Sequence, residues 1–239
     1  MSAENTQSRT LPGNAAERAA TRRDTARLEA FSDGVFAIAI TLLVLNIRVP
    51  LASELKGHTL LEALRQQWPA YLAYVVSFVT ILLMWVGHHN MFTFIHRIDH
   101  TFLLLNGLLL MGIAIVPFPT GLLAEYLPQA SYMNQQTAAA VASLTYAFIA
   151  AMYDVLYWYA VTGQRLIAPA RQAPVPWTPL LIYIGGPLLY IVAAGLALWA
   201  PGFGVKASLA IFVLMVVLYA LPVTSQRSGS LPVRSLPQE

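Results

Sequence analysis

Residues 27–47 read RLEAFSDGVFAIAITLLVLNI and join a charged start to a long apolar run. Arg27, Glu29 and Asp33 are ionisable, whereas no residue from 34 to 47 is. Charge at the edge of a membrane span is costly, so it marks either a function or a demanding structural contact. The stretch therefore predicts a first membrane-spanning helix with a candidate site at its mouth.

The composition of the whole chain agrees with a membrane protein. Of the 239 residues 57% are hydrophobic and only 10% are charged, against roughly 25% charged residues in soluble domains. There is no cysteine, which excludes disulfides and thiolate chemistry, and a net charge of +3 is too small for a nucleic-acid partner. Residues 1–26 are polar and lack the apolar core of a signal peptide. We expect an all-α integral membrane protein.

Six apolar segments approach the length of about 20 residues that a membrane span needs. They cover residues 31–49, 69–87, 101–118, 137–161, 177–199 and 205–221. Pro50 is expected to close the first span, and Pro117 with Pro119 the third. Between the first two spans, the leucines of residues 53–67 predict a helix that lies in the membrane interface.

Orientation follows from the basic residues, which gather on the cytoplasmic side of membrane proteins. A cytoplasmic N-terminus places ten of the fourteen Lys and Arg residues inside. The sequence thus predicts six spans with both termini in the cytoplasm. Residues 1–26 are expected to form a partly disordered tail that becomes helical from residue 15. Residues 27–223 form the membrane domain, and residues 224–239 a second cytoplasmic tail.

One face of the first span carries Ile38, Thr41 and Leu45, at helical spacing, and Gly34 extends the line. A stripe of this kind on a membrane helix most often faces lipid or a neighbouring helix, and threonine often bonds to its own backbone. It can also line a pore. The spacing alone leaves these alternatives open.

Two motifs of the chain resemble a known family. Arg-x-x-x-Phe-Ser-Asp at residues 27–33 and Trp-x-x-His-His at residues 85–89 are similar to signatures of the transmembrane protein 175 family of potassium channels. Leu105-Asn106 and residues 117–120 echo a third motif more weakly. The resemblance covers roughly residues 27–120. It implies the short bacterial type, with one six-span unit per chain and four identical chains around a central pore.

The resemblance also implies what the first span does. It would line the pore, with Ile38 at the narrowest ring, Thr41 in a polar layer beyond it and Leu45 in a second apolar ring. We therefore expect a potassium-favouring cation channel without a re-entrant selectivity loop, gated by a hydrophobic constriction. Its partners would be permeant potassium, lipid and three further copies of the chain, in a bacterial plasma membrane. No cofactor and no enzyme activity are expected.

A second implied role is a structural clamp at the cytoplasmic end of the pore helix. Asp33 lies roughly 140° around the helix from Ile38 at about 100° per residue, so it should anchor the helix rather than bind ions. Ser32 is expected to cap the start of the helix. The residues of the expected clamp are Arg27, Phe31, Ser32, Asp33, Trp85, His88 and Asn106.

Two other functions stay open. A membrane metalloenzyme could use the histidines that fall within thirteen residues, namely His88, His89, His96 and His100. Against it, only one other histidine is present and no His-Glu-x-x-His motif occurs. A secondary transporter would need an ionisable group inside a span, and Asp154 is the candidate for that role.

Overall fold

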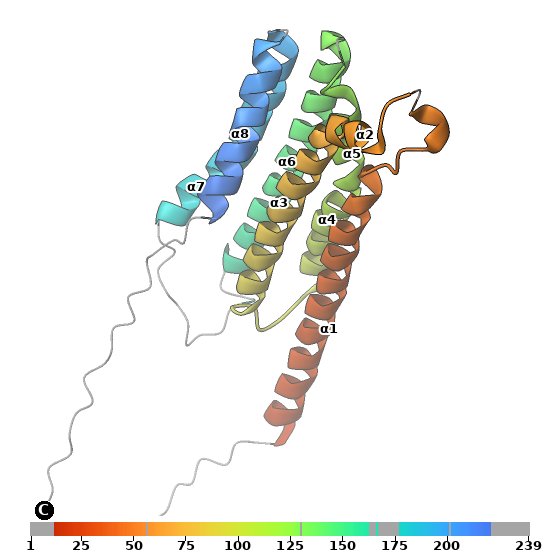
Figure 1. Cartoon of the computed structure of the whole chain (residues 1–239). Helices are drawn as coiled ribbons and strands as arrows, with labels where there is room; N and C mark the ends of the chain where they lie inside the picture. Colours follow the sequence, from red (N-terminus) through yellow and green to blue (C-terminus); the bar gives the residue numbers. More distant parts are fainter. Residues whose placement is uncertain are drawn as a thin grey trace, which may run out of the picture.

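The computed structural model describes residues 12–55, 57–129, 131–162, 166, 177–200 and 202–220, and their regular elements are helices. The elements are α1 (Pro12–Leu42), η1 (Leu43–Asn46), η2 (Ala52–Glu54), α2 (Leu60–Gln66), α3 (Trp68–Phe92), α4 (His100–Ile115), α5 (Pro117–Tyr126), α6 (Tyr132–Val161), α7 (Trp177–Trp199) and α8 (Phe203–Ala220). The long helices lie side by side in one bundle (Figure 1). Of the expected N-terminal tail, residues 1–11 lie outside the described residues, and so does the whole of the tail expected at residues 224–239.

Five stretches of the described chain are long and apolar enough to cross a membrane. They are residues 20–46, 68–92, 100–126, 132–161 and 203–220. The described side chains of α7 begin at Gly185, so the apolar stretch counted there, Gly185–Trp199, is shorter. The backbone of α7 nevertheless has the bounds expected for the fifth span. The chain is a multi-pass membrane protein, and the total of six spans stays a prediction.

Helix α1 begins at Pro12, three residues before the helix that the sequence predicted to lead into the first span. It runs without a break from Pro12 to Leu42, and its N-terminal end projects beyond the other helices (Figure 1). The expectation that Ser32 caps a helix start is therefore wrong. Ser32 lies inside α1, and its hydroxyl donates to the carbonyl of Leu28 at 2.9 Å. The helix continues through the charged residues because an exposed helix tolerates them well.

The third span also differs from its expected form. Pro117 and Pro119 do not end it, because a second helix, α5, starts at Pro117 after a single turn residue, Val116. Proline is tolerated in the first turn of a helix, where its missing N–H has no partner in any case. α4 and α5 together make one stretch of 27 residues, from His100 to Tyr126.

The connection between α1 and α3 contains the short helix α2. Thr59 starts it with a capping box, in which its hydroxyl accepts from the N–H of Glu62 and the Glu62 carboxylate accepts from the N–H of Thr59. The hydrogen bond from the Thr59 N–H to the carboxylate is the main cause that lowers the pKa of Glu62. Leu60 and Leu61 are exposed. A helix with exposed leucines thus lies within the expected interfacial segment, although it is shorter.

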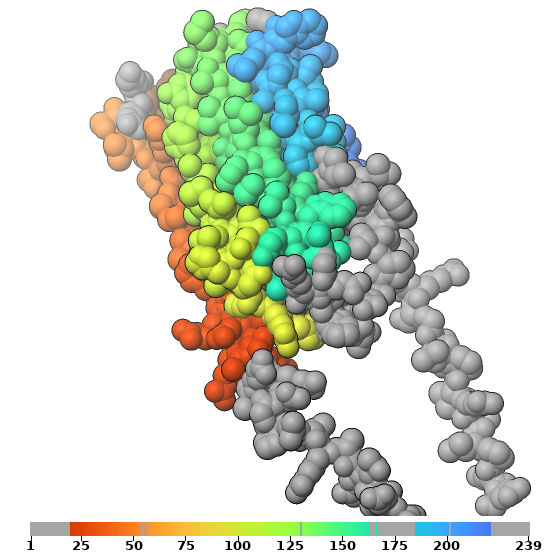
Figure 2. Space-filling view, turned by 180° about the vertical axis from the view of Figure 1, so that it is seen from behind, coloured from red at the N-terminus to blue at the C-terminus, as the bar shows by residue number. Residues whose placement is uncertain are grey.

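Helix α6 holds the bundle together, with α4 and α5 on one side and α7 and α8 on the other. Most of its buried residues are Ala or Ser, which lets helix backbones approach closely in a membrane. α1 packs instead on α3, α4 and α5, at the opposite edge of the molecule from α7 and α8 (Figures 1 and 2). One side of α1 is consequently left without another of the described helices against it.

Candidate functional site

Helix α1 has a buried face and an exposed face. Ser32, Phe36, Ala39 and Leu43 are at most 1% exposed and follow one another at spacings of four, three and four residues. This is the helical periodicity that packs one face against a neighbour. The packed face fixes how α1 is rotated in the bundle, and it determines which residues point outward.

The residues that the sequence placed on the pore line all point outward. Gly34, Ile38 and Thr41 in α1 and Leu45 in η1 are exposed, with Ile38 at 61% and Leu45 at 72%. The Thr41 hydroxyl donates to the carbonyl of Ile38 at 2.9 Å, so its oxygen keeps lone pairs for a second contact. The line is free on the single chain, and it is available to a neighbouring copy, a pore or lipid.

Behind this line, three buried polar side chains connect three helices. The Asn106 amide in α4 donates to the Ser32 hydroxyl in α1 at 3.0 Å, and its oxygen lies 2.9 Å from His88 Nε2 in α3. An amide oxygen can only accept, so in this arrangement His88 carries its proton on Nε2. All three residues are 0% exposed. Buried polar groups are costly unless they are paired, so this network specifies how the three helices fit together.

A second set of contacts joins α1 to α3. The Trp85 indole donates to the Asp33 carboxylate at 2.8 Å, and its ring stacks on His89 with centroids 5.8 Å apart. His89 Nδ1 in turn lies 3.1 Å from the carboxylate of Glu29. The acidic residues Glu29 and Asp33 are both engaged by α3, on the side of α1 that faces away from Ile38.

Two residues of the expected clamp lie outside the network. Phe31 is 63% exposed, and Arg27 is exposed with no hydrogen bond or ion pair to any described residue. The structure brings together the other five, which are Ser32, Asp33, Trp85, His88 and Asn106. Their hydrogen bonds do not pass through Arg27.

The sequence analysis missed several neighbours of His88. Phe36 and Phe92 lie against its ring, with centroids 5.4 and 4.5 Å away, and Tyr153 meets it edge-on at 6.5 Å. The Tyr153 hydroxyl also donates to the Met84 carbonyl, which ties α6 to α3. The aromatic residue types were a partial signal for these contacts, because aromatic rings pack well around a buried histidine. Nothing in the sequence, however, places α6 beside α3.

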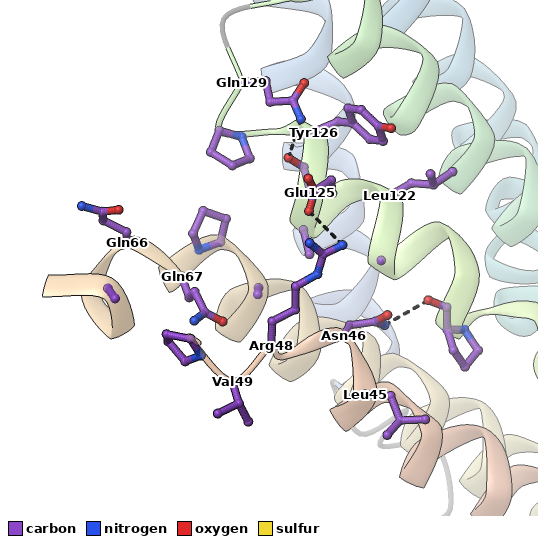
Figure 3. Close-up of a pocket in the computed structure, with 18 of the residues that line it drawn as sticks. Leu45, Asn46, Arg48, Val49, Gln66, Gln67, Leu122, Glu125, Tyr126 and Gln129 are labelled. Atoms are coloured by element: carbon purple, nitrogen blue, oxygen red, sulfur yellow. Dashed lines mark hydrogen bonds and ion pairs between the residues drawn. The ribbon is translucent and has the colours of Figure 1, made fainter. Parts of the chain in front are cut away.

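The other end of α1 is held by different contacts. The Asn46 amide donates to the Pro117 carbonyl at 3.0 Å, and the Arg48 guanidinium lies 3.5 Å from the Glu125 carboxylate (Figure 3). These contacts cross a cavity of about 750 Å³ between the end of α1, the start of α3 and α5. Leu45 lies on its wall. The exposed line of α1 is thus anchored to the bundle at both ends.

The histidine cluster does not form a metal site. Among the described residues no three histidines or carboxylates are grouped so that they could hold an ion. His88 bonds to Asn106 and His89 to Glu29, while Nδ1 of His96 lies 3.1 Å from the carbonyl of Phe94. Asp154, the transporter candidate, is partly buried on α6.

Comparison with known proteins resolves the class. The family model for the endosomal/lysosomal potassium channel TMEM175 matches residues 27–117, which contain both signature motifs. A potassium channel of Chamaesiphon minutus is 47% identical over 176 residues, which are 73% of this chain and 84% of the relative. The chain belongs to the TMEM175 family. A potassium channel of Streptomyces collinus is 46% identical over 73% of this chain and 82% of its own.

The fold agrees with a solved structure of the TMEM175 family. The crystal structure of a lysosomal potassium-selective channel TMEM175 homolog from Chamaesiphon minutus matches with a TM-score of 0.70 and 40% identity. The match covers 83% of this chain and 97% of that one. The TMEM175 family and these relatives are ion channels, so the channel interpretation of the sequence is confirmed, and the metalloenzyme and the transporter are not favoured.

Proposed function

We propose that this protein is a potassium-favouring cation channel of a bacterial plasma membrane. Four copies assemble around an axis with α1 innermost, and each copy crosses the membrane six times with both termini in the cytoplasm. The observation that carries the proposal is the exposed line of Gly34, Ile38, Thr41 and Leu45 on a helix that one edge of the bundle leaves uncovered. The named potassium channels at 46–47% identity support the choice of ion.

In this assembly the line of α1 performs the gating. One Ile38 side chain from each subunit makes an apolar ring that excludes water and raises a barrier to ions. When the ring widens, partly hydrated cations pass, and the Thr41 oxygens supply contacts beside it. Leu45 adds a second apolar ring. Ile38 has no group that coordinates an ion, so conduction depends on the width of the ring.

The buried network would hold this geometry. Ser32 and Asp33 lie roughly 120° and 140° around α1 from Ile38, at about 100° per residue, so both anchors are on the side away from the axis. Their contacts to Asn106 and Trp85 resist rotation of the helix. A rotation of one residue position would replace Ile38 at the constriction, so the clamp serves the gate without touching an ion.

Current recording on purified protein in planar bilayers tests the proposal. With potassium on the cytoplasmic side and sodium outside, a potassium-favouring channel reverses at a negative cytoplasmic voltage. A reversal at zero would remove the preference, and a reversal that follows a proton gradient instead would make protons the permeant ion. Native mass spectrometry on the same sample should give four chains, and a monomer would contradict the assembly.

A further inference from the structure

The exposed line of α1 continues towards the N-terminus, past the residues of the expected pore lining. The helix is unbroken from Pro12 to Leu42, and eleven residues make just over three full turns. Arg27 lies eleven residues before Ile38, and Arg23 eleven before Gly34. At about 100° per residue Arg27 is within roughly 20° of the direction of Ile38, and Arg23 within roughly 60°. Two guanidinium groups therefore extend the pore-facing line towards the N-terminus.

These two arginines have no partner within the described chain. Both are exposed, and neither forms a hydrogen bond or ion pair with a described residue. Two of the acidic groups on α1, Glu29 and Asp33, are turned away and engaged by His89 and Trp85. Asp24 is exposed roughly 40° from the direction of Ile38, so each chain presents two guanidiniums and one carboxylate on this side.

The orientation of the chain in the membrane does not require the two arginines to point in this direction around α1. Basic residues next to a span favour the cytoplasmic side whichever way they point around the helix. Arg22 is equally suited to that role, yet it lies roughly 160° from the direction of Ile38 at about 100° per residue. Arg23 and Arg27 therefore differ from Arg22 in the direction in which they point around α1, although all three carry the charge that orients the chain.

We propose that Arg23 and Arg27 form a binding site for soluble multivalent phosphates at the cytoplasmic mouth of the pore. The inference rests on the proposed function, because four copies of α1 around an axis bring together two guanidiniums from each chain. The planar fork of a guanidinium matches phosphate oxygens, and charge-assisted contacts of this type are stronger than neutral ones. One anion held between several copies would neutralise the positive charge that each single chain leaves exposed.

Such a site would regulate cation flow from the cytoplasm. An empty positive ring lowers the local cation concentration at its mouth and so reduces outward current. A bound anion neutralises the ring and removes that penalty. Outward potassium current should therefore rise when the site is filled, whereas inward current, which enters at the other end, should change less.

The test uses the full tetramer in bilayers of phosphatidylcholine, with tripolyphosphate added on the cytoplasmic side without magnesium. We expect it to raise outward current in the wild type. The double variant R23Q/R27Q should already carry the larger outward current and should not respond. Titration calorimetry in detergent should give tripolyphosphate binding that is weaker in this variant by about tenfold or more, because two charge-assisted contacts per chain are lost.

R22Q is the control for direction, because it removes one guanidinium per chain next to Arg23 in the sequence but on the other side of α1. It should bind tripolyphosphate and respond as the wild type does, and size-exclusion chromatography checks that all variants stay tetrameric. An unchanged response in R23Q/R27Q, an equal loss in R22Q, or a response that requires anionic lipid would overturn the proposal. Potassium current that ignores tripolyphosphate would refute this site alone, whereas absence of any cation current would refute the proposed function itself.

Discussion

At the scale of the residue, Ile38 shows how a side chain can act through its size and apolar nature alone. It is 61% exposed on a helix whose opposite face is fully packed, so its contacts within the chain do not explain its position. A branched aliphatic group cannot replace the water around an ion, and a narrow ring of such groups dries out. Polarity at this position should therefore control the barrier directly.

The substitution Ile38→Asn should raise single-channel potassium conductance, because four amides keep the constriction wet and offer oxygens to the ion. Val44→Asn is the control, since Val44 is 51% exposed on η1 but lies off the line. It should leave conductance close to that of the wild type. Equal conductance in Ile38→Asn and wild-type channels would remove Ile38 from the constriction.

Asn106 tests the clamp at the same scale. Asn106→Leu keeps the volume but leaves the buried His88 Nε2–H without an acceptor, which costs about 1–3 kcal/mol of unfolding free energy. Thermal unfolding in detergent should therefore shift downward. Asn90→Leu makes the same chemical change at an exposed position of α3 and should have little effect. If Asn106→Leu kept full stability and tetramer but lost its preference for potassium, the clamp would be the wrong role.

At the scale of the element, the length of the apolar segments predicted well where helices lie and poorly where they end. The bounds of α7 agree with the expected span because nothing but apolar composition decides them. The third span was predicted to end too early, because proline was expected to stop the helix. Proline disrupts the inside of a helix, but it is tolerated at the start of one, as at the start of α5. The family motifs pointed to Ser32, Trp85, His88 and Asn106. The contacts of Tyr153 and Glu29 depend instead on which helices pack together, and the sequence does not show that.

The junction of η1 with α5 gives a prediction at this scale. A Cβ added to Gly121 would lie 2.7 Å from Oδ1 of Asn46. Gly121→Ala should push the Asn46 side chain away and break its bond to Pro117, with faster hydrogen exchange at the end of α1 and a loss of about 0.5–1.5 kcal/mol. Gly107→Ala is the control, because no atom lies within 4 Å of its added Cβ. It should stabilise the helix by up to about 1 kcal/mol. Equal exchange in Gly121→Ala and wild type would show that Asn46 does not hold α1.

At the scale of the whole molecule, the edge position of α1 matters most. A helix that carries the motif of the family, that is anchored at both ends and that leaves one side uncovered is suited to meet identical copies of itself. Closed rotational symmetry is the usual solution for identical subunits. It would convert four exposed lines into one continuous lining, from Arg23 at one end to Leu45 at the other.

The absence of cysteine from the sequence makes this arrangement directly measurable. A single Ile38→Cys substitution places the only thiol of each chain at the expected constriction, and its reactivity can be read as potassium current during exposure to cadmium or a charged thiol reagent. The account predicts rapid loss of current in Ile38→Cys and none in Leu214→Cys, whose side chain is exposed on α8. Current through Ile38→Cys that persists unchanged would contradict a pore lined by α1.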